Sequence, residues 1–440
     1  MNNLKRIYFL LPVFIQNMVI SIVGYRLKKT RMNNEFFSFL KFYNTTPKEE
    51  LIKREQIRLK EFLEFSQKSF FWKEKFEKYN VDITSENIEE ELRKLPVLTK
   101  EEVKDNINNI LIKDRNLIKV HTSGTTGGGL IFYESKKSQS ERWAVWWRYR
   151  MYHGIKIDTW FGWFGGMSII NIKQKKPPFY RVNYPERRVM FSAHHLNEDT
   201  VSHYSNAIIK RRLIWLHGYP SQLSYFASLC LDKNINFEFV TNITLGAENF
   251  LKNQKNIMQR VFPNAKITEH YGLAESVANI SENKERDLVL DRYFSYSEFI
   301  PTENKNKYRI VGTNLSNPNF PLIRYNTNDI ATVIDNKIIS IDGRKEDFVL
   351  LKDGTKYGRL DHIFKDLIHI KEAQIRQIST DKIVFHIVKG KHFDKEKELD
   401  KLIYEINALF KDKIEFEIVF KNFIERTESG KLRFVISEIN

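Results

Sequence analysis

Apolar residues in the first third of the chain recur at two spacings, one typical of helices and one typical of strands. Residues 48–68 carry apolar side chains at helical spacing with charges between them, which predicts an amphipathic helix. Residues 117–122 and 130–133 have the pattern of short strands on either side of a glycine-rich turn. In residues 141–154, four large side chains fall on one helical face, and we expect them in the core. These are Trp143, Trp146, Trp147 and Met151.

The pattern changes twice further along the chain. From about 205 to 270, helical segments alternate with short apolar runs, which is typical of an α/β architecture with a largely parallel sheet. After 330, strand-like runs at 374–378, 382–388, 414–420 and 432–436 surround one helix at 394–410. We therefore expect a large N-terminal domain, residues 1–340, and a small α+β domain, residues 341–440, joined near 342–347.

The N-terminal residues 7–25 contain no charge and are flanked by Lys and Arg on both sides. This stretch approaches the length that spans a bilayer, but Pro12, Gln16 and Asn17 interrupt its apolar centre. A true span is the alternative; we favour an interfacial or buried helix whose basic flanks face anionic lipid. No small-residue cleavage pattern follows, which argues against a secretory signal. We expect a cytoplasmic protein, with residues 1–30 as a membrane-associated helix at the inner face of the cell membrane.

The charge of the chain limits the kinds of partner that we expect, and its cysteine content indicates the cellular compartment. Lys and Arg total 71 against 55 Asp and Glu, a net charge of +16. The basic residues are spread along the chain without a helix-turn-helix, zinc-finger or RNA-recognition pattern, so no nucleic-acid partner is expected. The single cysteine, Cys230, excludes an intramolecular disulfide and points to a reducing compartment. It lies in a predicted helix, where we expect a small buried residue.

The glycine-rich turn, HTSGTTGGGL at 121–130, first suggests a Walker phosphate loop. Gly124 and Gly129 match its outer glycines, but Leu130 and Ile131 stand where Lys and Ser or Thr are required. The chain also continues as a strand, so the helix dipole of a Walker loop is missing. Small residues still let backbone N–H groups converge on an anion, and neighbouring hydroxyls add donors. The turn therefore predicts a phosphate site, against the alternative of a flexible hairpin.

The same turn resembles the phosphate loop of the adenylate-forming enzymes, the superfamily of acyl-CoA synthetases, peptide-synthetase adenylation domains and luciferases. The similar residues are TSGTTG at 122–127, YGLAE at 271–275, YNTND at 325–329, GRKED at 343–347 and RTESGK at 426–431. Five motifs in the family's order are specific as a set. GYPS at 218–221, GAE at 246–248, PLIRYNTND at 321–329 and DGRKEDFVLLKDG at 342–354 are similar to the phenylacetate-CoA ligase branch and, within it, to CapK-like proteins of capsule and surface-polysaccharide biosynthesis.

This resemblance implies an α/β fold with mixed sheets in the large adenylate-forming domain and a small, mobile C-terminal domain. It also implies ATP and Mg²⁺ as cofactors. The phosphates of ATP would contact Ser123, Gly124, Thr125, Thr126 and Gly127. Adenine would lie against Gly246, Ala247, Glu248, Tyr271 and Gly272. Asp329 would accept the ribose hydroxyls, Arg344 would reach the ribose or phosphate, and Asp347 would be the pivot of the small domain. Glu275 would hold Mg²⁺, and Lys431, Glu275 and Thr126 would form the catalytic set.

The reaction implied is activation of a carboxylic acid, amino acid or uronic acid as an acyl adenylate. The acceptor stays open between coenzyme A and an amino sugar or amino acid, and a scaffold of a glycan assembly complex that has lost turnover is a third alternative. Gly128 and Gly129 stand where many relatives carry a cation, so the loop lacks an adjacent positive charge. Asn328 replaces the glycine of Y-x-T-G-D, and we expect the turn to survive because Asn tolerates positive φ.

Overall fold

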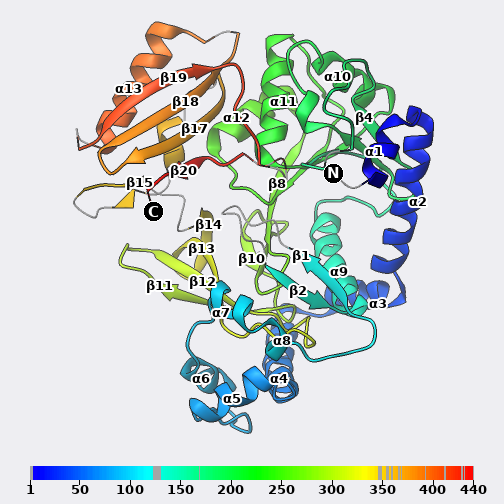
Figure 1. Cartoon of the computed structure of the whole chain (residues 1–440), viewed down its shortest axis with the longest axis vertical. Helices are drawn as coiled ribbons and strands as arrows, with labels where there is room; N and C mark the ends of the chain where they lie inside the picture. The colour runs from blue at the N-terminus through cyan, green and yellow to red at the C-terminus, as the bar shows by residue number, and fades with distance from the viewer. Residues whose placement is uncertain are drawn as a thin grey trace. The chain divides into compact units, whose positions relative to one another are not determined.

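The computed structural model (Figure 1) describes most of the 440 residues. The described residues are 3–121, 130–167, 169–344, 349–352, 356–357, 360–364, 367, 369–391, 393–410, 413–427, 430 and 432–439. The chain divides into two compact units. One unit comprises residues 1–25, 158–269 and 343–440, and the other comprises 26–157 and 270–342. The expected boundary between 340 and 341 stays a prediction.

The first unit contains a mainly parallel sheet with helices between its strands. Its strands are β3 (Phe161–Phe164), β4 (Tyr180–Asn183), β5 (Arg188–Phe191), β6 (Trp215–Gly218), β7 (Asn242–Gly246) and the start of β8 (Lys266–Gly272). Its helices here are α1 (Asn3–Leu10), the start of α2 (Val13–Arg31), η1 (Ala193–His195), α10 (Val201–Lys210), α11 (Pro220–Asp232) and α12 (Lys252–Val261). Strand β3 runs parallel to β5 and β6, β6 runs parallel to β7, and β4 is antiparallel to β5. The predicted α/β alternation is confirmed.

Helix α11 has almost no exposed face, because it lies in the core beside this sheet. Residues 220–230 of this helix are almost all buried, because strands pack on one side and α10 and α12 on others. Phe226, Phe237 and Phe262 are fully buried in one cluster. Cys230 lies in the same cluster with no exposed surface, as expected, and burial raises the pKa of its thiol to about 12.

The N-terminal apolar stretch forms two helices, because proline interrupts it. Helix α1 ends at Leu10 and α2 begins at Val13, on either side of Pro12, which has no N–H to continue the first helix and suits the start of the second. Among the described residues, no helix is long and apolar enough to cross a membrane.

The C-terminal part of the first unit is a four-stranded sheet with one long helix. Its elements are β15 (Val349–Leu350), β16 (Lys356–Tyr357), η2 (Leu360–Phe364), β17 (Ile370–Ser379), β18 (Lys382–Lys389), α13 (Lys395–Phe410), β19 (Glu415–Lys421) and β20 (Val435–Ser437). The strand order is β19-β18-β17-β20. Leu402, Ile406 and Phe410 follow the four-residue helical spacing and are buried in the cluster of this sheet. The predicted α+β pattern after 330 is confirmed in kind and order.

The second unit combines helices with antiparallel strands. Its helices are the end of α2, α3 (Asn34–Thr45), α4 (Lys48–Ser66), α5 (Phe70–Lys78), α6 (Ile88–Lys94), α7 (Lys100–Asp105), α8 (Ile107–Ile110) and α9 (Lys136–Tyr152). Its strands are β1 (Ile118–His121), β2 (Ile131–Glu134), the end of β8, β9 (Asn279–Glu282), β10 (Leu288–Leu290), β11 (Tyr296–Pro301), β12 (Lys307–Thr313), β13 (Tyr325–Ile334) and β14 (Lys337–Arg344). The strand order in its larger sheet is β11-β12-β13-β14-β10-β9-β8.

Helix α9 differs from expectation in one respect. Trp147 is buried as predicted, but Trp143 and Trp146 are half-buried, and Met151 at the end of the same stripe is 42% exposed. The buried face of α9 instead includes charged side chains, because their partners come from other elements. Glu141 accepts a hydrogen bond from Arg58 Nη2 (2.8 Å) and another from the Tyr43 hydroxyl (2.7 Å). An apolar stripe in the sequence could not reveal these pairings.

Candidate active site

The carboxyl ends of β3, β6 and β7 meet at one edge of the sheet in the first unit. Since these strands are parallel, the segments that follow them emerge on the same side. Residues 165–166 follow β3, the GYPS segment follows β6, and Ala247 and Glu248 follow Gly246 at the end of β7. Sequence reasoning singled out two of these three segments. The structure brings them together at the edge where ligands bind in open α/β sheets.

Gly218 is required by the close approach of two strand ends. A Cβ atom at this position would lie 2.1 Å from the carbonyl oxygen of Phe164. The same carbonyl accepts a hydrogen bond from the N–H of Tyr219 (2.9 Å). Helix α11 then starts at Pro220, with proline in the first turn, where its missing N–H is tolerated. The glycine and proline of GYPS thus set the sharp turn from β6 into α11.

Glu248 joins the turn after β6 to the C-terminal motif. Its Oε2 accepts a hydrogen bond from the N–H of Ser221 (3.1 Å), and its Oε1 accepts one from the N–H of Leu432 (3.0 Å). Burial raises the pKa of this carboxyl, and the Ser221 hydrogen bond opposes that shift. Ala247 precedes it at φ +68°, a region uncommon for residues other than glycine. The predicted adenine segment therefore also contacts residue 432 directly.

Arg426 is a further site residue that was not predicted. Its Nη1 donates a hydrogen bond to the Ser221 hydroxyl (3.2 Å), and its Nη2 forms an ion pair with Glu372 on β17. Burial lowers the pKa of the Arg426 guanidinium to about 10. Its position at the start of RTESGK was the available signal. Nothing in the sequence marked Glu372 as its partner.

Gly430 completes the contact between this motif and the sheet edge. It has φ +76°, and a Cβ atom there would lie 2.3 Å from the Cα of Gly166. Both conditions exclude a larger residue. Arg426 and Gly430 of the C-terminal motif, and Leu432 directly after it, thus contact segments at the carboxyl ends of β3, β6 and β7.

In the second unit, the predicted adenine and ribose residues contact each other. The Tyr271 hydroxyl donates a hydrogen bond to Oδ2 of Asp329 (2.7 Å). Burial, followed by the negative charge of Asp329, raises the pKa of Tyr271 well above its usual value, so the phenol keeps its proton. The N–H of Asp329 donates to the Thr327 hydroxyl (3.0 Å). Asn328 has φ +62°, so asparagine adopts the conformation that glycine would supply.

Arg142 holds the segment from Gly272 to Glu275. From the sequence, Arg142 was expected only as part of the helix at residues 141–154. Arg142 Nη1 donates to the carbonyl oxygen of Ala274 (2.8 Å), and its Nη2 donates to Glu134 Oε1 (2.9 Å). Gly272 allows a close approach, because a Cβ there would lie 2.7 Å from Oδ1 of Asn279. Glu275 itself is only 8% exposed. The long sequence separation between Arg142 and Ala274 left no signal for this contact.

The remaining predicted residues lie partly outside the described residues. The phosphate-loop residues Ser123, Gly124, Thr125, Thr126 and Gly127 are outside them, as are Asp347 and Lys431. On either side of these residues, β1 and β2 pair antiparallel, with His121 opposite Ile131, so the two predicted strands are confirmed. Arg344 ends β14, and its side chain is not described. The roles of all these residues stay predictions.

Glu275 is the one residue predicted to hold a metal ion. Among the described residues, no group of three or more His, Cys, Asp or Glu side chains could hold a metal ion. Glu275 supplies a carboxylate, the kind of hard oxygen ligand that Mg²⁺ takes singly or in pairs alongside substrate phosphates. Its low exposure agrees with a ligand that is positioned rather than freely solvated.

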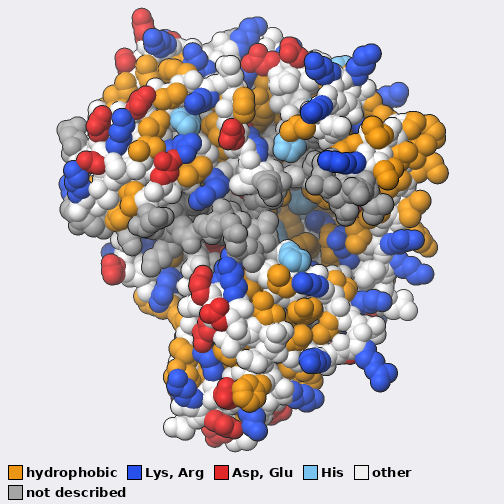
Figure 2. Space-filling model, viewed as in Figure 1, with side chains coloured by type: hydrophobic (Ala, Val, Ile, Leu, Met, Phe, Trp, Pro, Cys, Tyr) orange, Lys and Arg blue, Asp and Glu red, His pale blue; other side chains and the backbone are white. Residues whose placement is uncertain are grey.

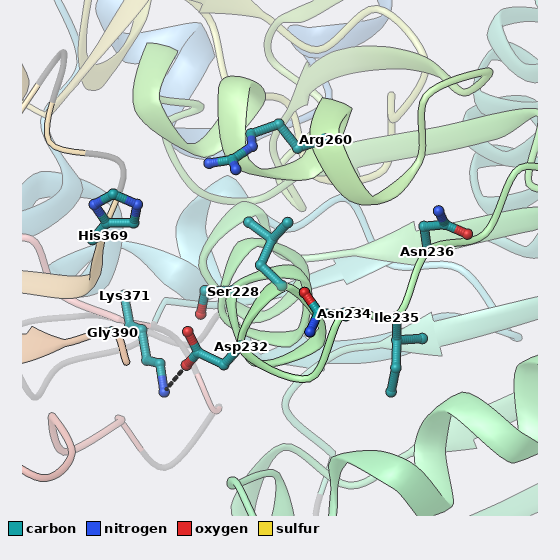
Figure 3. A pocket seen from close by; sticks show the side chains of 10 residues that line it. Ser228, Asp232, Asn234, Ile235, Asn236, Arg260, His369, Lys371 and Gly390 are labelled. Atoms are coloured by element: carbon teal, nitrogen blue, oxygen red, sulfur yellow. Dashed lines mark ion pairs between the residues drawn. The ribbon is translucent and has the colours of Figure 1, made fainter. Parts of the chain in front are cut away.

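A cavity of about 310 Å³ lies beside the end of α11 (Figure 3). None of the predicted site residues lines it. Lys371 on β17 points toward Asp232 at the end of α11, and its Nζ lies 2.7 Å from Oδ2 of Asp232. The same Nζ lies 2.9 Å from Glu198 Oε1. This cavity therefore borders a second contact between the C-terminal sheet and α11.

Comparisons with known proteins agree with the sequence motifs. Residues 351–438 match the family model described as the CapK C-terminal domain. The chain is 28% identical to Protein CapK of Staphylococcus aureus over 459 aligned residues, covering 99% of this chain and 100% of that relative.

Among solved structures, 2-hydroxyisobutyryl-CoA ligase in its postadenylation state, in complex with R3-HIB-AMP, matches with a TM-score of 0.69 at 14% identity, covering 91% of this chain and 92% of the other. An open conformation of that ligase, in complex with 2-HIB-AMP and CoA, matches with a TM-score of 0.52 at 15% identity, covering 89% and 92%. The predicted resemblance and fold class are confirmed. The chain has the mixed α/β fold of adenylate-forming ligases, and its C-terminal sheet domain is similar to that of CapK.

Proposed function

We propose that this protein is an ATP-dependent ligase that activates a carboxylic acid as an acyl adenylate and then transfers the acyl group to an acceptor. The observation that carries the proposal is the seating of the C-terminal motif at the carboxyl ends of β3, β6 and β7. Leu432, the residue after Lys431, donates its N–H to Glu248 of the predicted adenine segment. A lysine in this motif is useful for adenylation only if the motif reaches the nucleotide site.

A carboxylate is a weak electrophile, so the substrate must first be joined to a good leaving group before its acyl group can be transferred. A carboxylate oxygen of the substrate attacks the α-phosphorus of ATP, the bond from that phosphorus to the bridging oxygen of pyrophosphate breaks, and pyrophosphate leaves. The protein must align these atoms and stabilise negative charge. We assign the backbone and hydroxyls of residues 123–127 to the β- and γ-phosphates, and Thr126 to the catalytic set with Glu275 and Lys431. We assign the Lys431 ammonium to the substrate carboxylate and α-phosphate.

We assign the nucleoside contacts as the sequence motifs imply them. Tyr271 and Gly272 would lie against adenine together with Gly246 and Ala247, and Asp329 would accept the ribose hydroxyls. The hydrogen bond from Tyr271 to Asp329 supports this assignment, because it fixes the ring beside the carboxylate. Arg344 would reach the ribose or α-phosphate. Mg²⁺, held by Glu275, would neutralise charge on the phosphates.

For the acceptor, we propose an amino sugar or an amino acid in capsule or surface-polysaccharide assembly. The similarity to Protein CapK along nearly the whole chain supports this over coenzyme A. Coenzyme A is the second candidate, supported by the shared fold with a CoA ligase. We place the reaction in the cytoplasm, where ATP is available, beside the inner face of the membrane.

Exchange of labelled pyrophosphate into ATP tests the activation step. The protein and Mg²⁺ are incubated with ATP and a panel of carboxylic, amino and uronic acids, and exchange that depends on one of these acids is expected. Lys431→Ala should suppress exchange without changing thermal unfolding, whereas Lys421→Ala, an exposed lysine on β19, should leave it unchanged. Binding of ATP without exchange for any acid would favour the scaffold alternative instead.

The transfer step needs a separate readout. Product masses are compared after incubation with coenzyme A and, in parallel, with amino-sugar and amino-acid acceptors. A mass increase only with coenzyme A would contradict the proposed acceptor and leave the activation step intact.

A further inference from the structure

Helix α2 has an unusual orientation, with its polar residues facing the protein. Asn17 Oδ1 accepts a hydrogen bond from the N–H of Val182 (2.9 Å), and the Ser21 hydroxyl accepts one from the N–H of Tyr184 (3.2 Å). Gln16 is buried and accepts a hydrogen bond from Arg181 Nε (2.6 Å). These partners lie on or just after β4, which is the edge strand of its sheet.

The interruptions in the apolar stretch are thereby explained. The free edge of a β-sheet needs its backbone groups covered, and α2 covers this one with side-chain oxygens. Gly24 lets the helix lie close, because a Cβ there would come within 2.3 Å of the Asn183 side chain. The polar face of α2 is therefore used inside the protein.

The opposite face of α2 and the exposed side of α1 are apolar. We call this the apolar face; it comprises Ile7, Leu10, Phe14, Met18, Ile22 and Tyr25. Phe14, Met18, Ile22 and Tyr25 recur at spacings of four, four and three residues, which places them on one side of the helix. Each of the six is between 54% and 84% exposed, and Leu10 is the most exposed.

The clustering is not typical of the rest of the surface. Of the 22 exposed large hydrophobic side chains in the described part of the chain, eight lie between residues 7 and 27. Figure 2 shows orange side chains gathered at the right of the view, where α1 and α2 lie in Figure 1. Single exposed apolar residues need no explanation, but a contiguous group marks an interaction surface.

The charged residues around the apolar face indicate what binds to it. The first 34 residues contain no Asp or Glu, and six Lys and Arg flank the apolar face. These are Lys5, Arg6, Arg26, Lys28, Lys29 and Arg31. A helix that combines an exposed apolar face with basic ends fits the interface of an anionic bilayer, where apolar side chains enter the acyl boundary and cations meet lipid headgroups.

We propose that the apolar face of α1 and α2 docks the protein onto an anionic lipid membrane, with both helices lying in the plane of the interface. This placement does not depend on the proposed ligase activity. It differs from a membrane span, because the inward face of α2 is occupied by β4.

Sedimentation with lipid vesicles tests the proposal. The full chain is mixed with vesicles of phosphatidylcholine alone, and with vesicles that also contain phosphatidylglycerol. Stronger partitioning to the anionic vesicles is expected, and added salt should weaken it. Failure of the wild-type protein to bind anionic vesicles above the level of neutral ones would overturn the proposal.

Matched variants locate the binding surface. Replacing Leu10, Phe14 and Met18 by Gln should lower the partition coefficient by at least about tenfold, because apolar contact drives insertion. The single change Leu10→Gln, at the most exposed position, should lower it in the same direction if the triple variant misfolds. As a control, Ile57, Phe70 and Tyr404 are exposed by 61–70%, and replacing them by Gln should change nothing. A loss as large in this control set would contradict the proposed surface.

A second copy of the chain is the competing occupant. Light scattering coupled to size-exclusion chromatography, without lipid, measures the molar mass of wild type and of Leu10→Gln. A monomer for both supports the membrane. A wild-type dimer that dissociates in Leu10→Gln would assign the apolar face to self-association and overturn the proposal.

Discussion

Replacing Lys371 by Met should weaken the contact between the C-terminal sheet and α11. The Lys371 side chain is only 2% exposed and is paired with Asp232 and Glu198. The substitution keeps most of the aliphatic volume and removes the charge. Asp232, whose side chain is 13% exposed, then keeps the N–H of Lys391 as a donor to its Oδ1 (3.1 Å).

The two ion pairs of Lys371 contribute unequally to the expected decrease in the free energy of unfolding. Removing one partner of a buried pair typically destabilises by about 3–5 kcal/mol, because the other charge is left buried. Asp232 keeps some exposure and one donor, which lowers the expectation to about 2–3 kcal/mol. The Glu198 side chain is 73% exposed, so its pair contributes at most about 1 kcal/mol. Unfolding in urea, followed by circular dichroism, measures the change.

Two further variants test the reasoning. Lys371→Met combined with Asp232→Leu should recover most of the loss, since an apolar pair replaces a buried ion pair at little cost. Lys382 on β18 is 39% exposed and lies 3.8 Å from Glu417, so Lys382→Met should change stability by less than about 0.5 kcal/mol. A stability of Lys371→Met within that same margin of wild type would refute the buried-pair argument, as would a double variant less stable than the single one.

Three other changes have separate readouts. Glu248→Ala removes the acceptor for the N–H groups of Ser221 and Leu432, so pyrophosphate exchange should fall about tenfold or more while the exposed control Glu238→Ala retains it. Asn328→Ala should lower the free energy of unfolding by about 1 kcal/mol because φ is +62°, and Asn328→Gly should not; equal losses would contradict the role of backbone conformation. Burial, then the charge of Arg150, lowers the pKa of His270 to about 3 in the folded protein, so below about pH 6.5 only the unfolded chain gains this proton. Stability should therefore fall as the pH falls from 7 to 5, by about 2 kcal/mol more in wild type than in His270→Gln, and parallel pH profiles would count against this assignment.

Local patterns in the sequence predicted the helix at 48–68, the strands beside the glycine-rich turn, the α/β alternation from 205 to 270 and the C-terminal sheet domain. The strands and helix after residue 330 follow from periodicity, because each is a single amphipathic segment on one sheet. Gly218, Gly430 and Asn328 could be understood in advance, since each is a residue type suited to a close approach or a positive φ. The five motifs in order then identified the architecture that the structural comparison confirms.

Local sequence patterns could not predict contacts between segments that are far apart in the chain. Arg142 and Ala274 are 132 residues apart, and Arg426 reaches Ser221 across 205 residues. The inward polar face of α2 was hidden for the same reason. Gln16 and Asn17 looked like interruptions of an apolar helix, and only the edge of β4 shows why they are there. Such contacts depend on which helices and strands lie side by side in the fold, and the spacing of apolar residues along the chain does not show this.

Helix α11 connects the candidate site with the second contact of the C-terminal sheet. Ser221, in its first turn, meets Arg426 and Glu248, whereas Asp232, at its end, meets Lys371. These residues are eleven apart, which corresponds to about 16 Å along a helix. Arg426 and Lys371, which contact α11, both belong to the C-terminal sheet domain. Arg426 pairs with Glu372 on β17, and Lys371 is the residue before Glu372 on the same strand. Two contacts this far apart resist rotation of that domain about α11, whereas either contact alone would act as a pivot. Loss of the Lys371 ion pair should therefore loosen the C-terminal motif at the sheet edge, although none of the residues in this pair is a predicted site residue.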